Sequence, residues 1–536
     1  MSPACRQDGG SDQLNASGRI AWADRRLWAF VLGVAAVTIG VVLHLPMFWM
    51  GRSMGFRMAG MPMDAGMIAG MWTIIAGVGL AAYGLLPPNL SRHVADARTI
   101  VVAAPEDAHL SWAHWRLMLV LVVALVIDIM KPASLGFTIP GMVDEYGLSR
   151  QTVSLVPFFA LIGTVVGSFV WGVIADVCGR KATILLSAVM FVGTSICGAM
   201  PSLAWNIGMC FMMGAAAGGM LPVTYALLAE MMPSRHRGWS LVLVGGLGAV
   251  GGYAAASLMA AWLVPVFGWR ILWLANLPSG LLLVLLGTFI PESAKFLMAR
   301  GRDEEARRVM ANFGAAVRKV ATPAPAPAAQ SQASALVGRA FAGKLAALSL
   351  VAVCWGLVNF GLLLWLPVEL VARGYSMKVS SELLAASALI AVPTVFLAAW
   401  LYSAWSTKRA VLLSIAVTLF GLAGVLWLAT TTGASPVLPV ALLIVGSNGI
   451  IAMVLPYAAE SFPLRIRGRA TGWIAACSKL GGVFAQALSI FAIIPTLGVS
   501  AAMIAVPTAV SLLLVARFGR ETRGRDLRHL DTDGSV

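Results

Sequence analysis

The segments YALLAEMMPSRHRG (residues 225–238) and YAAESFPLRIRG (residues 457–468) end two distant apolar stretches with the same acid–proline–arginine pattern. The shared positions are Glu230, Pro233, Arg235, Arg237 and Gly238 in the first segment and Glu460, Pro463, Arg465, Arg467 and Gly468 in the second, each pair 230 residues apart. The glycine pairs at 251–252 and 481–482 keep this offset, and GRK at 179–181 precedes TKR at 407–409 by 228 residues. Because several matches keep their order at nearly one offset, the sequence predicts an internal duplication.

The composition is typical of a membrane protein. Hydrophobic residues make up 59% of the chain and charged residues 11%, and the mean hydropathy is +0.85. A helix needs roughly 20 apolar residues to cross a bilayer, and by this measure the sequence predicts about fourteen spans. The expected fold is an all-α polytopic membrane protein. Two six-helix pseudo-repeats form a twelve-helix core, and two N-terminal helices precede it.

The apolar stretches and the polar segments between them divide the chain into six parts. In order, we expect a disordered cytoplasmic tail (1–26), a two-helix module with its linker (27–110), the first six-helix bundle (111–291), a cytoplasmic loop (292–342), the second bundle (343–517) and a basic cytoplasmic tail (518–536). The loop contains the Pro/Ala-rich stretch KVATPAPAPAAQSQASALVG, which is typical of a linker.

The net charge of +15 could indicate a nucleic-acid partner, but the positions of the charges favour membrane topology as its cause. Lys and Arg gather in alternate loops, which would all lie on one side of a bilayer. Basic loops remain cytoplasmic under the positive-inside rule. We therefore expect a multi-pass protein of the plasma (bacterial inner) membrane, monomeric, with both termini in the cytoplasm. The six cysteines are scattered, so neither a disulfide framework nor a metal site is expected from them.

The loop motifs carry a resemblance to a known family. GVIADVCGRK (172–181) fits G-x-x-x-D-x-x-G-R-K, the two opening segments fit E-x-x-P-x-x-x-R-G, and PESAKFLMARGRDEEA follows the first bundle. With these motifs, residues 115–517 resemble the major facilitator superfamily, specifically its sugar-porter and metabolite:proton symporter branches. The resemblance implies two bundles that rock about a central site. It also implies gating or structural roles for Gly172, Asp176, Gly179, Arg180, Lys181, Glu230, Pro233, Arg237, Glu460, Pro463 and Arg467.

The resemblance predicts a lock at the cytoplasmic face. Glu230 and Glu460 are expected to pair with arginines and clamp neighbouring helices in the outward-open state, and inward opening would break these contacts. Alternatively, these arginines are ordinary basic residues of cytoplasmic loops, and the proline only marks the end of a helix. Ala404 stands where the first half has Asp176, so the lock should be asymmetric. Cys210 stands where many relatives carry an arginine, which disfavours a drug antiporter.

Ionisable residues inside a membrane span cost about 2.5–3.5 kcal/mol each on insertion scales, so each is a functional candidate. Asp128, the one carboxylate expected deep inside a core span, is the predicted proton carrier. Lys131 and Lys479 are predicted to offer a positive charge from each half to an organic anion. Alternatively, Asp128 and Lys131 neutralise each other on one helix face, and Lys479 reaches toward the interface. Further candidate substrate contacts are the aromatic and amide side chains Tyr225, Asn276, Trp355, Asn359, Asn448, Tyr457 and Gln486.

The sequence thus predicts a secondary active transporter, not an enzyme, that needs no cofactor and couples uptake of a small organic anion to protons. The alternatives are a sugar or polyol symporter, an exporter, and a membrane sensor or metal-handling protein on the same scaffold. The last depends on the methionine-rich residues 44–71, because thioethers and His44 suit Cu(I), although methionine is also a common apolar filler. The N-terminal helices lie outside the resemblance. A chain without residues 1–110 is expected to fold and transport.

Overall fold

The structure, a computed structural model, describes residues 25–86, 109–299, 301–314, 339–431, 435–462, 464–491 and 496–523. Every regular element of this part of the chain is helical, which confirms the all-α membrane fold. Thirteen of its helical segments are long and apolar enough to cross a membrane, and the shorter apolar stretch Ile271–Gly287 occupies the remaining predicted span. Most of the two predicted tails and of the Pro/Ala-rich linker, Pro463, and the side chain of Arg467 lie outside the described residues.

The first half of the core runs from α5 to α13. Its elements are α5 (Trp112–Tyr146), α6 (Arg150–Val153), α7 (Leu155–Cys178), α8 (Arg180–Gly193), η2 (Thr194–Ala199), α9 (Leu203–Ala217), α10 (Met220–Met231), α11 (Ser234–Phe267), α12 (Ile271–Leu274) and α13 (Asn276–Gly287). Pro132 and Pro140 lie inside α5. Each proline removes one backbone hydrogen bond, so the second half of α5 is held less firmly by its own backbone than an uninterrupted helix.

The second half repeats this order. Its elements are α16 (Arg339–Gly356), η5 (Leu357–Leu362), η6 (Leu363–Trp365), α17 (Leu366–Ala372), α18 (Met377–Trp400), η7 (Leu401–Trp405), α19 (Thr407–Thr430), α20 (Val437–Ser461), α21 (Leu464–Ile490) and α22 (Leu497–Phe518). The segments η5 and η7 are π-helical. Such wide turns are frequent at functional sites, and η5 carries Asn359 and Phe360 into the interior.

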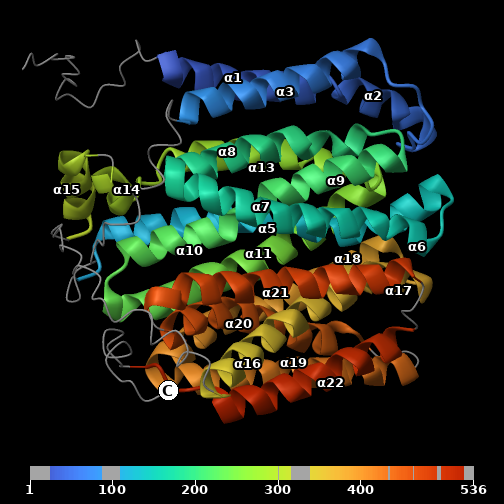
Figure 1. The fold of residues 1–536 in the computed structure, drawn as a ribbon. Coiled ribbons are helices and arrows are strands. Elements are labelled where there is room, and N and C mark those ends of the chain that lie inside the picture. The colour runs from blue at the N-terminus through green and yellow to red at the C-terminus, as the bar shows by residue number, and fades with distance from the viewer. Residues whose placement is uncertain are drawn as a thin grey trace, which may run out of the picture.

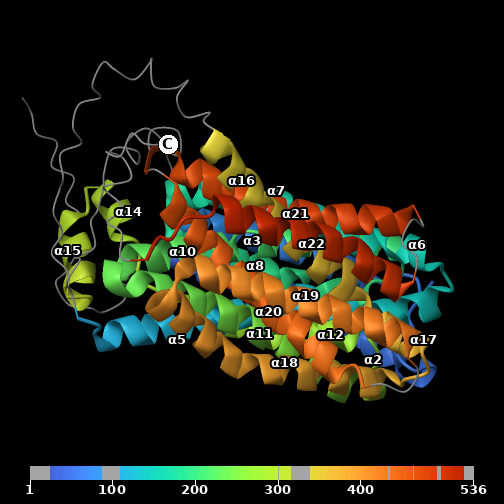
Figure 2. The ribbon, with the colours of Figure 1, turned by 90° about the horizontal axis from the view of Figure 1, so that it is seen from below.

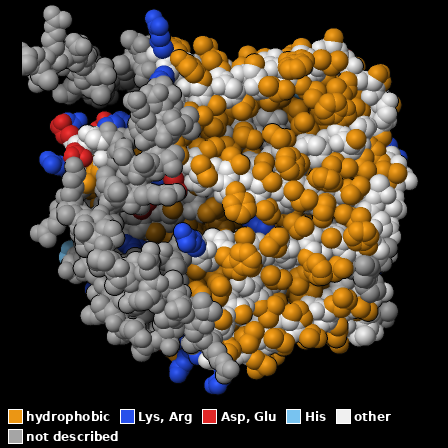
Figure 3. Space-filling view, viewed as in Figure 1, with side chains coloured by type: hydrophobic (Ala, Val, Ile, Leu, Met, Phe, Trp, Pro, Cys, Tyr) orange, Lys and Arg blue, Asp and Glu red, His pale blue; other side chains and the backbone are white. Residues whose placement is uncertain are grey.

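The helices of both halves run between two ends of the molecule. We call the motif end the one where α7, α10, η7 and α20 finish, next to Gly179, Met232, Ser406 and Phe462. The opposite end holds the α5–α6, α11–α12 and α17–α18 junctions. The short helices α14 (Ala294–Ala299) and α15 (Asp303–Asn312) lie beyond the motif end in both views (Figures 1 and 2). Hydrophobic side chains cover the face between the ends (Figure 3), as the lipid-facing surface of a membrane protein requires.

The N-terminal module consists of α1 (Arg25–Val42), α2 (Leu45–Met50), η1 (Gly51–Met54) and α3 (Ala65–Leu85). Figure 1 shows it as an outer layer beside the first half, away from the second. Its two long helices pack with their backbones in contact: a Cβ added to Gly33 would lie 2.7 Å from the carbonyl oxygen of Gly77. Small residues permit such close approach between membrane helices. The candidate metal ligand His44 is buried, with Nδ1 2.7 Å from the Gly40 carbonyl oxygen.

Candidate functional site

A cavity of about 340 Å³ lies between the two halves of the core. The first half lines it with residues of α5, α7, α9, α10 and α11, and the second with residues of α16, η5, η6, α17, α20 and α21. Most of the lining is apolar or aromatic, with a few polar side chains among it. This volume and composition are those of a small-molecule site, for which cavities of roughly 300–1,000 Å³ are usual.

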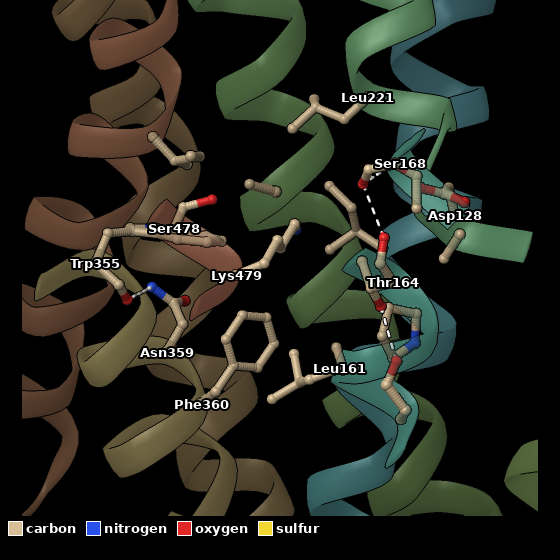
Figure 4. A pocket seen from close by; sticks show the side chains of 18 of the residues that line it. Asp128, Leu161, Thr164, Ser168, Leu221, Trp355, Asn359, Phe360, Ser478 and Lys479 are labelled. Carbon is tan, nitrogen blue, oxygen red and sulfur yellow. Dashed lines mark hydrogen bonds between the residues drawn. The ribbon is translucent and has the colours of Figure 1, made fainter. Parts of the chain in front are cut away.

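Lys479 provides a positive charge to this cavity. Its side chain extends from α21 toward the middle of the cavity (Figure 4). The ammonium nitrogen lies 5.5 Å from the ring centre of Trp355 and 5.9 Å from that of Phe360. The structure gives it no hydrogen bond or ion pair with another described residue, so two aromatic rings are its close partners. The donors of Lys479 therefore remain available to a ligand.

Asp128 lines the cavity from α5, in the other half of the core. Its side chain is buried, and Oδ1 has no hydrogen-bond partner among the described residues. Burying an unpaired polar atom costs free energy, so packing alone does not explain a carboxyl group here. The attraction between Asp128 and Lys479 acts across the cavity, although the structure places no direct ion pair between these two described side chains.

Lys131, predicted to face the ligand, does not line the cavity. Its Nζ donates to the Phe191 carbonyl oxygen at 2.5 Å and to Thr194 Oγ1 at 2.7 Å. It also lies 4.2 Å from the Phe191 ring centre, and no ion pair joins it to Asp128 within the described structure. Asp128 and Lys131 are three residues apart on α5, so their side chains point in directions that differ by about 60°. This difference is enough for Asp128 to face the cavity while Lys131 faces α8 and η2.

Three other predicted substrate contacts also lie outside the cavity lining. The amide of Asn276 donates to the Leu272 carbonyl oxygen at 2.5 Å, and the hydroxyl of Tyr457 donates to the Arg520 carbonyl oxygen at 2.6 Å. The amide of Gln486 donates to the carbonyl oxygen of Phe360. Each of these side chains donates to a backbone carbonyl oxygen, because an apolar interior offers few other acceptors. These side chains support the helices rather than contact the cavity.

Tyr225, Trp355, Asn359 and Asn448 do line the cavity, and their contact with substrate stays a prediction. Four lining aromatics were not predicted from the sequence: Phe137, Phe169, Tyr253 and Phe360. Phe360 directly follows Asn359, and Tyr253 directly follows the repeated glycine pair, so both were adjacent to positions already singled out. The Tyr253 hydroxyl is buried without a partner among the described residues.

At the motif end of the first half, Arg180 connects two helix ends. Its guanidinium lies 3.1 Å from Glu230 and 3.5 Å from Asp176. Glu292 accepts the backbone N–H of Arg180 at 2.9 Å, and Ser293 donates to Glu230. Burial raises the pKa of Glu292, against backbone N–H groups that favour its ionised form. All of these residues belong to the first half or to the segment that directly follows it.

The motif end of the second half has a network around the carboxylates of Glu460 and Glu521. Glu460 accepts hydrogen bonds from Tyr402 at 2.9 Å and Thr522 at 2.7 Å. Glu521 accepts the backbone N–H of Thr407 at 3.0 Å and the hydroxyl of Ser406. Burial opposes ionisation of Glu521, but the hydrogen bonds from Ser406 and Thr407 outweigh it and lower the pKa of Glu521 to about 2. Both carboxylates thus accept hydrogen bonds from hydroxyl groups.

The contacts at the motif end differ from the predicted lock in one respect. The Arg180–Glu230 pair lies within the first half, and the hydrogen bonds of Glu460 to Tyr402 and Thr522 lie within the second. Rocking of one half against the other does not by itself break these described bonds, and the gating role of Glu230 and Glu460 stays a prediction. They hold the helices of each half together.

At the opposite end, the described residues include polar contacts between the two halves. The hydroxyls of Ser154 and Ser489 are 2.8 Å apart, and Arg150 Nη1 is 3.9 Å from Glu369 Oε2. The Arg150 guanidinium also lies 4.4 Å from the ring centre of Trp365. These contacts join the two halves at the opposite end.

Comparisons with known proteins agree with this architecture. The Major Facilitator Superfamily profile matches residues 117–486. The chain is 27% identical over 446 residues to the niacin transporter NiaP of Acinetobacter baylyi, covering 80% of this chain and 99% of that protein. It is 26% identical to the 4-hydroxybenzoate transporter PcaK of the same organism, covering 73% of this chain and 86% of that protein.

Solved structures match as well. The proton:xylose symporter XylE superimposes with a TM-score of 0.63 at 17% identity, covering 79% of this chain and 99% of that one. At this identity the likeness concerns the fold alone. The profile match covers most of the chain and both halves of the core, so the chain belongs to the Major Facilitator Superfamily and is a membrane transporter rather than an enzyme.

Proposed function

We propose that the protein takes up a small aromatic or heteroaromatic monocarboxylate together with protons. The observation that carries this proposal is the ammonium group of Lys479, which faces the cavity between two aromatic rings. A half-buried cation in an apolar cavity, without a described anionic partner, is a strong binding site for a carboxylate, because charge-assisted hydrogen bonds are worth more where water is excluded.

The remaining lining supports a ring-shaped substrate. Phe360, Trp355 and Tyr253 offer aromatic faces, and Asn359 and Asn448 offer amide groups for ring substituents. A planar acid with its carboxylate at Lys479 would place its ring against these side chains in offset or edge-to-face contact. The named relatives, a niacin transporter and a 4-hydroxybenzoate transporter, carry compounds of this class.

Asp128 supports the proposal of proton coupling. It lines the same cavity from the other half of the core, and Oδ1 lacks a described partner. A carboxyl group in that position can take a proton from one side and release it on the other as the halves rock. Its attraction to Lys479 gives a reason for coupling, because a bound carboxylate would compete with Asp128 for the lysine charge.

The basic residues support the orientation. Arg180, Lys181, Lys408 and Arg409 lie at the motif end, and such residues remain in the cytoplasm under the positive-inside rule. We therefore infer that both termini are in the cytoplasm, and in a bacterium the membrane would be the inner one. The contacts between the halves at the opposite end would then close the cavity toward the outside.

Uptake into proteoliposomes tests the proposal. Radiolabelled nicotinate and 4-hydroxybenzoate should accumulate under an inward proton gradient, and a proton-conducting ionophore should abolish accumulation but not counterflow. Matched compounds of the same ring size without the carboxylate, nicotinamide and phenol, should not accumulate. Accumulation of xylose with neither acid would favour the sugar symporter instead. Equal uptake with and without the gradient would refute proton coupling.

A further inference from the structure

The connection between α1 and α3, residues 51–64, is attached to the opposite end of the first half. The guanidinium of Arg57 lies 2.5 Å from the Asp144 carboxylate, at the end of α5. The backbone N–H groups of Met58 and Ala59 both donate to Glu145 Oε1, at 2.7 and 2.9 Å. The connection is therefore bonded to the last turn of α5 by side chain and by backbone.

Glu145 joins this connection to the rest of the first half. Its carboxylate also accepts from Arg270 Nη2 at 2.8 Å and from Trp269 Nε1 at 2.8 Å, and the Arg270–Glu145 side chains are 0% and 3% exposed. Arg270 in turn donates to the Met200 carbonyl oxygen at 2.7 Å. Two junctions of the first half, α5–α6 and α11–α12, and the N-terminal connection thus meet at one buried carboxylate, and Arg270 extends this network to Met200.

Phe56 anchors the connection by packing. Its ring stacks on Phe48 with a centroid distance of 4.9 Å and meets Phe267 of α11 edge to face at 5.7 Å. Its φ of 61° lies in the left-handed region, which is unfavourable for a residue other than glycine. A bulky residue persists in this conformation only when its surroundings compensate, so the ring is held in place by both neighbours.

The attached end of α5 is also the part that faces the second half. Gly136 packs so closely that an added Cβ would lie 2.6 Å from the Leu364 carbonyl oxygen. Pro132 and Pro140 flank this position, so the backbone hydrogen bonds of α5 hold its end less firmly than usual. Directly beyond this end, Arg150 of α6 and Ser154, which follows α6, contact the second half.

We propose that residues 51–64 are a positioning element for transport. They hold the proline-interrupted end of α5 in the place where α5 and α6 meet the second half, and so they favour closure of the opposite end. The N-terminal module thereby acts on the transport cycle through α5, without contacting the cavity. The proposal requires the chain to be a transporter but does not depend on which substrate it carries.

Closure can be measured without a substrate. The hydroxyl groups of Ser154 and Ser489 lie 2.8 Å apart at the contact between the halves. The full-length Ser154→Cys/Ser489→Cys variant therefore places two thiols next to each other there. The rate of disulfide formation with a mild oxidant then reports how often the opposite end closes. The native cysteines that the structure describes are all buried, which limits competing reactions.

Phe56→Ala in this background removes the packing anchor. We expect cross-linking to slow several-fold, because the aromatic contacts of Phe56 with Phe48 and Phe267 are lost. Uptake of 4-hydroxybenzoate should lose maximal rate while the half-saturating concentration stays nearly unchanged. Trp49→Ala is the matched control, because Trp49 lies near the connection but is 57% exposed. Equal cross-linking rates in Phe56→Ala and wild type, or equal slowing in Trp49→Ala, would overturn the proposal.

Charge exchange provides a second test that leaves the core intact. Arg57 and Asp144 are 61% and 70% exposed, so Arg57→Asp should fold normally but repel the end of α5. We expect slower cross-linking in Arg57→Asp and recovery in Arg57→Asp/Asp144→Arg. A general effect on folding would not recover in the exchanged pair. Failure of the double variant to recover, with normal protein levels, would also contradict the proposal.

Discussion

The ammonium nitrogen of Lys479 lies 5.5 Å from the ring centre of Trp355, inside the cavity between the two halves. A lysine in an apolar interior usually pairs with a carboxylate, whereas the half-buried Lys479 is flanked by aromatic rings and faces the cavity. The cation–π contacts compensate part of the cost of burying the charge, and a carboxylate ligand would compensate the rest.

Replacing Lys479 should weaken substrate binding. Lys479→Gln removes the charge-assisted contact, which is worth about 1.5–3 kcal/mol, or roughly ten- to hundred-fold in affinity. Lys479→Arg, which keeps the positive charge, should retain part of the affinity. Binding of nicotinate or 4-hydroxybenzoate to purified protein measures the change. Lys378→Gln, at an exposed lysine of α18, is the control. Unchanged affinity in Lys479→Gln would exclude this lysine as the carboxylate partner.

Replacing Asp128 should separate accumulation from exchange. Asp128→Asn cannot carry a proton, so uptake against a concentration gradient should stop, while counterflow of labelled substrate between equal pools should continue. Both are measured in the same proteoliposomes. Glu304→Gln, at a carboxylate that is 81% exposed, should accumulate substrate normally. Complete loss of counterflow in Asp128→Asn would mean that Asp128 holds substrate or structure rather than coupling protons.

Lys131→Met should leave substrate affinity unchanged, in contrast to Lys479→Gln. Lys131 donates to Phe191 and Thr194 rather than to the cavity. The Thr194 hydroxyl already donates to the Phe191 carbonyl oxygen at 3.1 Å, so both groups keep a partner when the lysine is removed. Exchanging a buried charge for an apolar side chain of similar volume is often neutral for stability. A large loss of affinity in Lys131→Met would instead support the substrate-binding role that the sequence predicted for Lys131.

Glu521 should stabilise the second half across the physiological pH range. Its pKa is lowered to about 2 in the folded protein, so its contribution is present above the ordinary glutamate pKa of about 4.3 and is lost as pH falls toward 2. The melting temperature of Glu521→Gln should therefore lie below that of wild type by a constant amount between pH 8 and 5. The difference should shrink below about pH 4. A difference that vanishes already at pH 6 would contradict this ionisation behaviour.

Removal of the N-terminal module tests its necessity directly. The sequence favoured a core that transports without residues 1–110, since the duplicated unit is complete without them. The contacts of Met58 and Ala59 with Glu145 favour the opposite outcome, because truncation leaves a buried carboxylate oxygen without two of its donors. We expect the truncated chain to insert into the membrane but to transport more slowly. Transport at the full rate would show that the module is dispensable.

Much of the architecture could be predicted from the sequence. The lengths of the apolar stretches predict the spans, because a bilayer admits only helices long enough to cross it. The offset between Glu230 and Glu460 predicts the duplication. The structure places both glutamates in networks at the motif end, and their described partners differ: Arg180 contacts Glu230, and the hydroxyls of Tyr402 and Thr522 contact Glu460. The absence of an aspartate at Ala404 was the visible signal of this difference.

The tertiary structure decided which buried charges share a site. By sequence, Asp128, Lys131 and Lys479 were equivalent, as ionisable residues in apolar spans. A rotation about 60° short of one full turn separates Asp128 from Lys131 on α5. Which of these two directions faces the other half depends on how α5 packs against α8 and α11. Local sequence therefore determined that the chain spans a membrane as two repeated bundles. Only the packing of those bundles brought Lys479 and Asp128 to one cavity, and only it attached the N-terminal connection to Glu145.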